Sequence, residues 1–177
     1  MQTITQCRRA SRIFEPIMLC LVSLGCSHPH GNTPDAVLRT NFSANESSFL
    51  ELRAMVLEDR NFLTISTKYV ITKTQTVNSP PARLELVGLS RERYQKYLEL
   101  FHSVGLDGVF RGEGGVVFRV NNPTLWNGDS SKGYMYSLAE PTPCVSNLDS
   151  YVPASRAHPW RVYSRLKQHW FLYLAVG

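Results

Sequence analysis

The stretch LSRERYQKYLELFHSVGLDGVFRGEGGVVFRV, Leu89 to Val120, predicts a helix that leads directly into a β-hairpin. Ser90 is a typical helix N-cap and Gly105 a typical C-terminal stop. Between them, apolar side chains recur at helical spacing, namely Tyr94, Tyr97, Leu98, Phe101 and Val104. Residues 109–120 then predict two strands joined by a tight turn, because glycine tolerates the positive φ angles of such turns and the segment contains Gly112, Gly114 and Gly115.

A second helix is expected upstream, over residues 43–60 (SANESSFLELRAMVLEDR). Ser43 and Glu46 have the spacing of a capping box. One face is apolar at helical spacing, through Phe49, Leu52, Met55 and Val56. Residues 62–72 (FLTISTKYVIT) are rich in β-branched residues and alternate in polarity, which predicts one strand. Residues 74–82 are expected to form a loop and residues 83–87 a short strand.

The C-terminal third predicts more sheet. Residues 132–138 are a strand candidate, and residues 139–159 form a long loop with four prolines. In residues 161–176 the first half is expected to be helical and the second half, from Trp170, a buried strand. The whole pattern predicts one α+β domain, residues 43–177, in which a mainly antiparallel sheet carries two helices packed on one face.

The N-terminal region has the organisation of a secretory signal. Arg8, Arg9 and Arg12 precede the uncharged run IMLCLVSLG, residues 17–25, which ends at Cys26. This run is far shorter than the roughly 20 residues that a helix needs to span a bilayer. Residues 1–25 are therefore expected to be a cleaved leader. A short buried N-terminal helix, with its cysteines in the core, is the alternative.

The stretch VSLGC, Val22 to Cys26, resembles the lipobox of bacterial lipoproteins. The rest of the chain resembles small lipoproteins of Gram-negative bacteria in five segments, which are residues 57–60, 93–106, 131–137, 148–150 and 169–174. The resemblance implies that Cys26 becomes the lipidated N-terminus and that the protein is membrane-anchored on the periplasmic side. Since Ser27 rather than aspartate follows the cysteine, it implies the outer membrane. The family brings no established activity and no catalytic residue.

Residues 26–42 (CSHPHGNTPDAVLRTNF) are rich in Pro, Gly and polar residues and predict a tether between anchor and domain. His28 and His30 beside Cys26 have ligand chemistry, but an acylated sulfur does not bind metal and a tether is a poor cage, so no metal or other cofactor is expected. Without acylation, Cys26 becomes available for a disulfide with Cys144. An ordinary cleaved signal would then give a soluble periplasmic binding protein.

The expected mode of action is binding. The formal net charge of +5, without a run of like charges, argues against nucleic acid. Aromatic residues and arginine concentrate in binding hot spots. Envelope proteins or peptidoglycan are the expected partners, and the candidate recognition residues are Trp126, Tyr134, Tyr136, Trp160, Arg156 and Arg161. For each ring, a place in an aromatic core is the competing interpretation.

One enzymatic alternative remains open, a hydrolase that uses Ser130 with Lys132 as its base. Ser131 is less suitable, because adjacent residues of a strand point to opposite faces. The structural interpretation of the same residues is a turn that enters an edge strand, where a lysine discourages aggregation.

Overall fold

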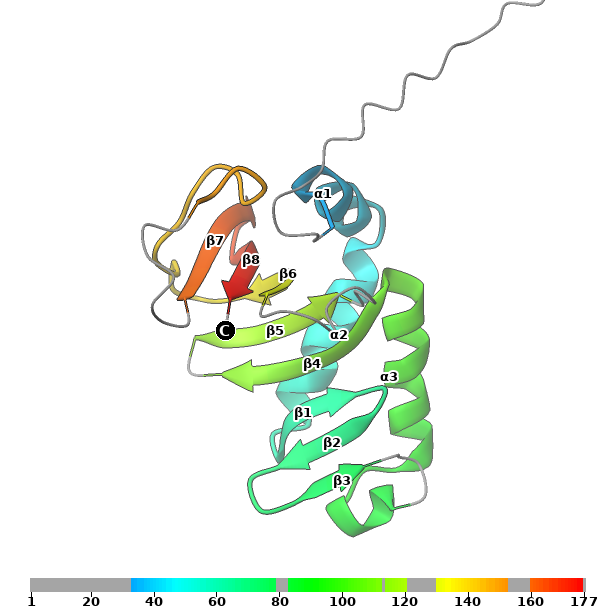
Figure 1. Ribbon diagram of the computed structural model, residues 1–177. Helices are drawn as coiled ribbons and strands as arrows, with labels where there is room; N and C mark the ends of the chain where they lie inside the picture. The colour runs from blue at the N-terminus through cyan, green and yellow to red at the C-terminus, as the bar shows by residue number, and fades with distance from the viewer. Residues whose placement is uncertain (1–32, 79–82, 113, 121–129, 153–159, 177) are drawn as a thin grey trace, which may run out of the picture.

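The computed structural model describes residues 33–78, 83–112, 114–120, 130–152 and 160–176 (Figure 1). These residues form one antiparallel sheet with the strand order β3-β2-β1-β4-β5-β6-β8-β7. The strands are β1 (Phe62–Ser66), β2 (Tyr69–Thr72), β3 (Thr76–Asn78), β4 (Leu106–Gly112), β5 (Gly115–Val120), β6 (Ser130–Tyr136), β7 (Trp160–Lys167) and β8 (Trp170–Val176). The helices are α1 (Asp35–Ala44), α2 (Glu46–Glu58), α3 (Arg91–Val104) and the short 3-10 helix η1 (Leu84–Val87).

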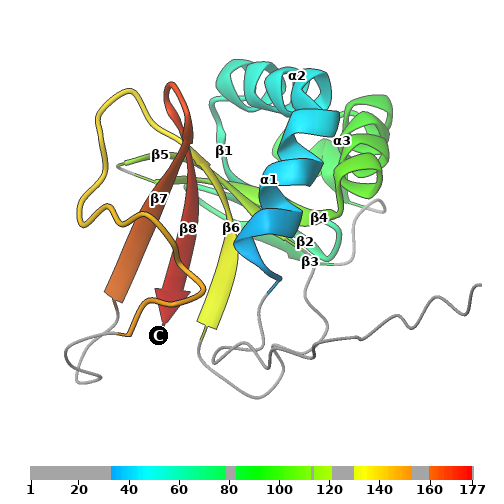
Figure 2. The same ribbon diagram turned by 90° about the horizontal axis from the view of Figure 1, so that it is seen from above.

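The predicted α+β class with a mainly antiparallel sheet is confirmed at that level. The described residues contain three α-helices, one more than expected. Buried side chains of all three helices share one apolar core with alternate residues of the sheet. Figure 2 shows the helices grouped together, with β7 and β8 at the other end of the sheet. Within this part of the chain, no helix has both the length and the apolar composition needed to cross a membrane.

The segment that decides the fold behaves as expected. The Ser90 hydroxyl accepts a hydrogen bond from the Arg93 N–H at 3.1 Å, which caps α3. Gly105 ends the helix with a φ of 71°, a conformation that glycine adopts without strain. β4 and β5 then form the predicted hairpin, in register from Leu106↔Val120 to Gly112↔Gly115.

The predicted tether and capping box are wrong for residues 35–44. Residues 35–42 belong to α1, in which Leu38 and Phe42 are buried in the core. Ser43 therefore lies inside a helix and caps nothing. The break between α1 and α2 falls at Asn45, whose amide donates to the Asn41 carbonyl at 3.0 Å. The prolines and polar residues that precede α1 favoured the prediction of a tether, although the segment contains a short amphipathic helix.

Local hydrogen bonds also overturn the predicted single strand over residues 62–72. The Ser66 hydroxyl accepts from the N–H groups of Lys68 and Tyr69, at 3.2 and 3.0 Å. This turn divides the segment into β1 and β2. The expected loop contains β3, which pairs with β2, and the expected short strand at residues 83–87 is η1 instead. Short apolar segments carry too few residues for periodicity to distinguish these states.

The expected helix at residues 161–167 is β7, which pairs with β8 from Trp160↔Val176 to Lys167↔Trp170. β8 itself is the predicted strand. Its apolar side chains alternate between the main core, through Leu172 and Leu174, and a smaller cluster with Phe171 and Tyr173 on the opposite face. Hydrogen-bonded pairing with this buried strand outweighs the helical propensity of the preceding segment.

Gly133 of β6 leaves no space for a side chain. A Cβ atom would lie 2.3 Å from the Phe118 carbonyl oxygen, whereas nothing lies within 4 Å of one at Gly112. We expect Gly133→Ala to destabilise the fold by about 2–4 kcal/mol through overpacking. The matched control Gly112→Ala should change the unfolding free energy by about 0.5 kcal/mol or less. Urea unfolding measures both, and equal effects of the two variants would contradict the close approach.

Candidate functional site

Lys132 is a buried cation held by two carboxylates. Its side chain points from β6 toward the beginning of α1 and is only 4% exposed. The Lys132 Nζ lies 2.6 Å from Asp35 Oδ1 and also forms an ion pair with Asp149 Oδ1. We call these three residues the lysine clasp. They come from β6, the first turn of α1 and the loop that follows β6.

The two carboxylates of the clasp are themselves fixed by backbone donors. The Asp35 N–H donates to Asp149 Oδ2 and the Leu148 N–H donates to Asp35 Oδ2, both at 2.9 Å. Leu148 is fully buried beside them. A carboxylate in the first turn of a helix is also favoured by the helix dipole. The clasp thus attaches the beginning of α1 and residues 147–149 to the sheet.

The expected edge strand is wrong, because β6 lies between β5 and β8 and Lys132 is buried rather than exposed at an edge. The geometry gives Lys132 a different structural role, as the cation that holds the clasp together. A lysine that acts as a general base must present an unprotonated amine to the serine hydroxyl. Here the Lys132 ammonium is engaged by two acidic groups. Ser130 lies on the same face of β6, two residues away.

Removing the cation of the clasp should cost about 3–5 kcal/mol of stability, because Lys132→Met leaves two carboxylates facing each other in a buried site. The control is Lys96→Met, since Lys96 forms a half-exposed pair with Glu51 at 3.0 Å and such pairs contribute about 0–1 kcal/mol. Chemical denaturation measures both. Adding Asp35→Asn and Asp149→Asn to Lys132→Met should restore part of the loss, and no recovery would argue against charge as the cause.

The recognition residues predicted on β6 have different environments. Tyr134 is fully buried, and its hydroxyl donates to the Leu38 carbonyl at 3.1 Å and accepts from the Asn41 amide at 3.0 Å. It is therefore a core residue. Tyr136 is half-buried on the same face of β6, and the Arg53 guanidinium stacks on its ring with 4.1 Å to the centroid.

The structure describes little of the other predicted recognition residues. Trp126 and Arg156 lie outside the described residues. Trp160 begins β7, but its side chain is not among the described ones, and Arg161 beside it is exposed. Cys26, His28 and His30 also lie outside the described part. Cys144 is a free, exposed thiol in the loop after β6.

Burial raises the pKa of Tyr134 to about 12, because the phenolate would lose its hydration. The unfolded chain releases this proton near pH 10. The contribution to stability is therefore complete below about pH 10 and is lost as the pH rises toward 12. We expect Tyr134→Phe to be less stable than wild type at neutral pH, yet to lose stability less steeply from pH 10 to 12. Urea unfolding at several pH values tests this, and parallel curves would contradict it.

An open groove of about 610 Å³ lies where α2, the β4–β5 turn and the segment after β6 meet. Its apolar lining includes Leu57, Met135, Leu138, Pro141 and Tyr163. Leu138 is 77% exposed and Leu57 39% exposed, so both present hydrocarbon to solvent. A volume of this size falls within the range of ligand pockets in proteins. We call this feature the α2 groove.

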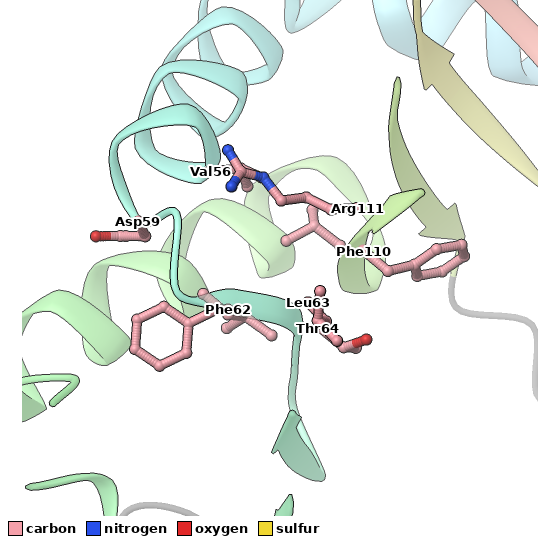
Figure 3. A pocket seen from close by; sticks show the side chains of 9 residues that line it. Val56, Asp59, Phe62, Leu63, Thr64, Phe110 and Arg111 are labelled. Atoms are coloured by element: carbon pink, nitrogen blue, oxygen red, sulfur yellow. The ribbon is translucent and has the colours of Figure 1, made fainter. Parts of the chain in front are cut away.

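A second, much smaller hollow lies between α2, β1 and β4 (Figure 3). Its volume of about 10 Å³ holds about one water molecule. Arg111 extends from β4 toward the end of α2, and its Nη1 donates to the carbonyl of Arg60, which follows that helix, at 3.3 Å. Asp59 accepts hydrogen bonds from Arg93 and Tyr97 at 2.9 and 2.7 Å. These contacts connect α2 to α3 and indicate a structural role for this hollow.

The interpretation of the sequence missed the α2 groove, apart from Tyr136. Arg53 and Leu57 are four residues apart, so a helix over residues 43–60 places both on one face. The sequence therefore already indicated that these two side chains are neighbours. No sequence pattern indicated that the segment from Leu138 to Thr142 lies near α2, because its position depends on where β6 ends and on the course of the loop after it.

Comparison with known protein families, with curated protein sequences and with solved structures yields no match to this chain. The described residues contain no group of three or more histidine, cysteine, aspartate or glutamate side chains arranged to hold a metal ion.

Proposed function

We propose that this chain is a lipid-anchored interaction module of the bacterial cell envelope, which binds a partner protein in the α2 groove. The observation that carries the binding proposal is the groove itself, with Leu57 and Leu138 exposed on its walls. Large exposed apolar side chains that line one concave surface are characteristic of interaction sites. The apolar lining favours a protein partner over peptidoglycan.

The anchor proposal rests on the leader and on VSLGC at Val22 to Cys26. Acyl chains on Cys26 would hold the protein at the membrane, since each buried methylene adds about 0.8 kcal/mol of affinity. The chain from Cys26 to Asp35, where α1 begins, spans at most about 30 Å. The domain would therefore stay close to the membrane surface, with the outer membrane as the proposed location.

We also infer that α1, α2 and α3 cover one face of the sheet. The support is the shared core, which contains buried side chains of each helix together with Tyr134, Leu172 and Leu174 of the sheet. The opposite face carries the smaller cluster around Phe171 and Tyr173. The α2 groove would then lie at the margin of the helical layer, within reach of a partner.

Metabolic labelling with a radioactive fatty acid tests the anchor. Wild-type protein and Cys20→Ala should be labelled equally, because Cys20 belongs to the leader. Cys26→Ala should lose the label and move from the membrane to the soluble fraction. Equal labelling of Cys26→Ala and wild type would sink the anchor proposal, and cleavage without labelling would indicate the soluble periplasmic form.

Photocrosslinking in living cells tests the groove. A photoreactive amino acid at Leu138 should give discrete, membrane-associated adducts with an envelope protein. The control position is Leu86 of η1, which is 70% exposed and does not line the groove. Adducts at Leu138 that disappear when Leu57→Asp is introduced support binding in the groove. Identical adduct patterns at both positions would contradict it.

A further inference from the structure

Arg53 of α2 is a cation that has no counter-ion within the described part of the chain. The described residues provide no ion pair for its guanidinium. Its Nε is buried and has no hydrogen-bond partner. The side chain is partly buried against the Tyr136 ring, so it is held in place rather than extended into solvent. Leaving buried donors of a charged group unsatisfied is costly, which makes this arrangement unusual.

The position of Arg53 connects it to the α2 groove. Tyr136 lines the groove, and Leu57, which also lines it, lies one helical turn after Arg53. The neighbouring charges are already neutralised: Glu140 pairs with Arg165 and Glu46 pairs with Lys167, each at 2.5 Å. Among the described residues, Arg53 is therefore a cation beside this end of the groove whose charge no carboxylate neutralises, and it reaches the groove through the Tyr136 ring.

The wall opposite α2 suits an extended chain. Residues 138–142 are largely exposed and belong to no helix or strand. Among the described residues, the backbone N–H groups of Leu138, Ala139, Glu140 and Thr142 have no backbone acceptor. An extended peptide recognises such a wall through its main chain, while pockets beside it select the side chains.

We propose that the α2 groove binds an extended acidic peptide segment of its envelope partner, in which a glutamate or aspartate side chain pairs with Arg53. Apolar residues next to the acidic one would contact Leu57 and Leu138. The planar guanidinium matches a carboxylate with two parallel hydrogen bonds. A side-chain carboxylate reaches the recessed Arg53 while the peptide main chain continues along the open groove. This inference rests on the proposed binding function and specifies its ligand.

The test uses an array of N-acetylated dodecapeptides attached through their C-termini, so that no terminal carboxylate is free. Each sequence is made twice, with Glu or with Gln at the centre and with Leu, Val, Phe or Tyr beside it. Full-length protein in detergent is applied as wild type, Arg53→Met, Arg53→Lys and the control Arg91→Met, whose exposed arginine lies on α3. Thermal unfolding monitors the fold of each variant.

For wild type and Arg91→Met, we expect some Glu peptides to bind about 10- to 100-fold more tightly than their Gln counterparts. Arg53→Met should remove this difference, and Arg53→Lys, which keeps the charge and serves if the Met variant unfolds, should retain only part of it. Equal binding of Glu and Gln peptides, the same preference in Arg53→Met, or no binding at about 1 mM would each overturn the inference. Adducts at Leu138 in cells would still support the proposed function in those cases. Glu-selective binding without such adducts would overturn the proposed function alone.

Discussion

The buried ammonium of Lys132 is the constraint on which the arrangement of this domain depends. A charge at this depth is tolerated only when carboxylates and hydrogen bonds replace its hydration. Asp35 and Asp149 do so, and they come from segments more than 100 residues apart in the chain. The clasp therefore specifies where α1 begins, where the loop after β6 returns and which face of β6 points inward.

The packing around α1 reinforces the clasp. Arg39 of this helix donates to the Arg165 carbonyl at 2.9 Å and to the Ser164 hydroxyl at 2.7 Å, which attaches it to β7. On the apolar side, Phe42 packs against Trp170 with ring centroids 5.0 Å apart. Polar contacts thus fix the register of α1, while ring packing supplies the buried apolar area that offsets the cost of ordering it.

The same loop that closes the clasp also forms one wall of the α2 groove. Leu138 and Pro141 line the groove, and Leu148 and Asp149 lie in the core and the clasp further along the chain. The two features therefore share one loop, which the clasp attaches to the sheet at Asp149.

Two tyrosines of β6 that share one face of the strand have different environments. Tyr134 lies within the core, and Tyr136, two residues later, stacks against Arg53 at the groove. Their spacing correctly predicts a shared face. The spacing does not predict how deeply each side chain is buried, because burial depends on which distant elements pack against that part of the strand.

The sequence by itself determined the elements whose signals are local. The Ser90 cap, the Gly105 stop and the glycines between β4 and β5 act through the conformations of a few neighbouring residues, so α3 and the hairpin were readable directly. Only the tertiary structure decided that residues 35–44 form a helix, that residues 160–167 form a strand, and that Lys132 meets two carboxylates. The physical reason is that each of these depends on a distant partner: the core beneath Phe42, the edge of β8, and the two aspartates. The residues of each segment alone do not identify the distant partner, so its effect is visible only in the folded chain.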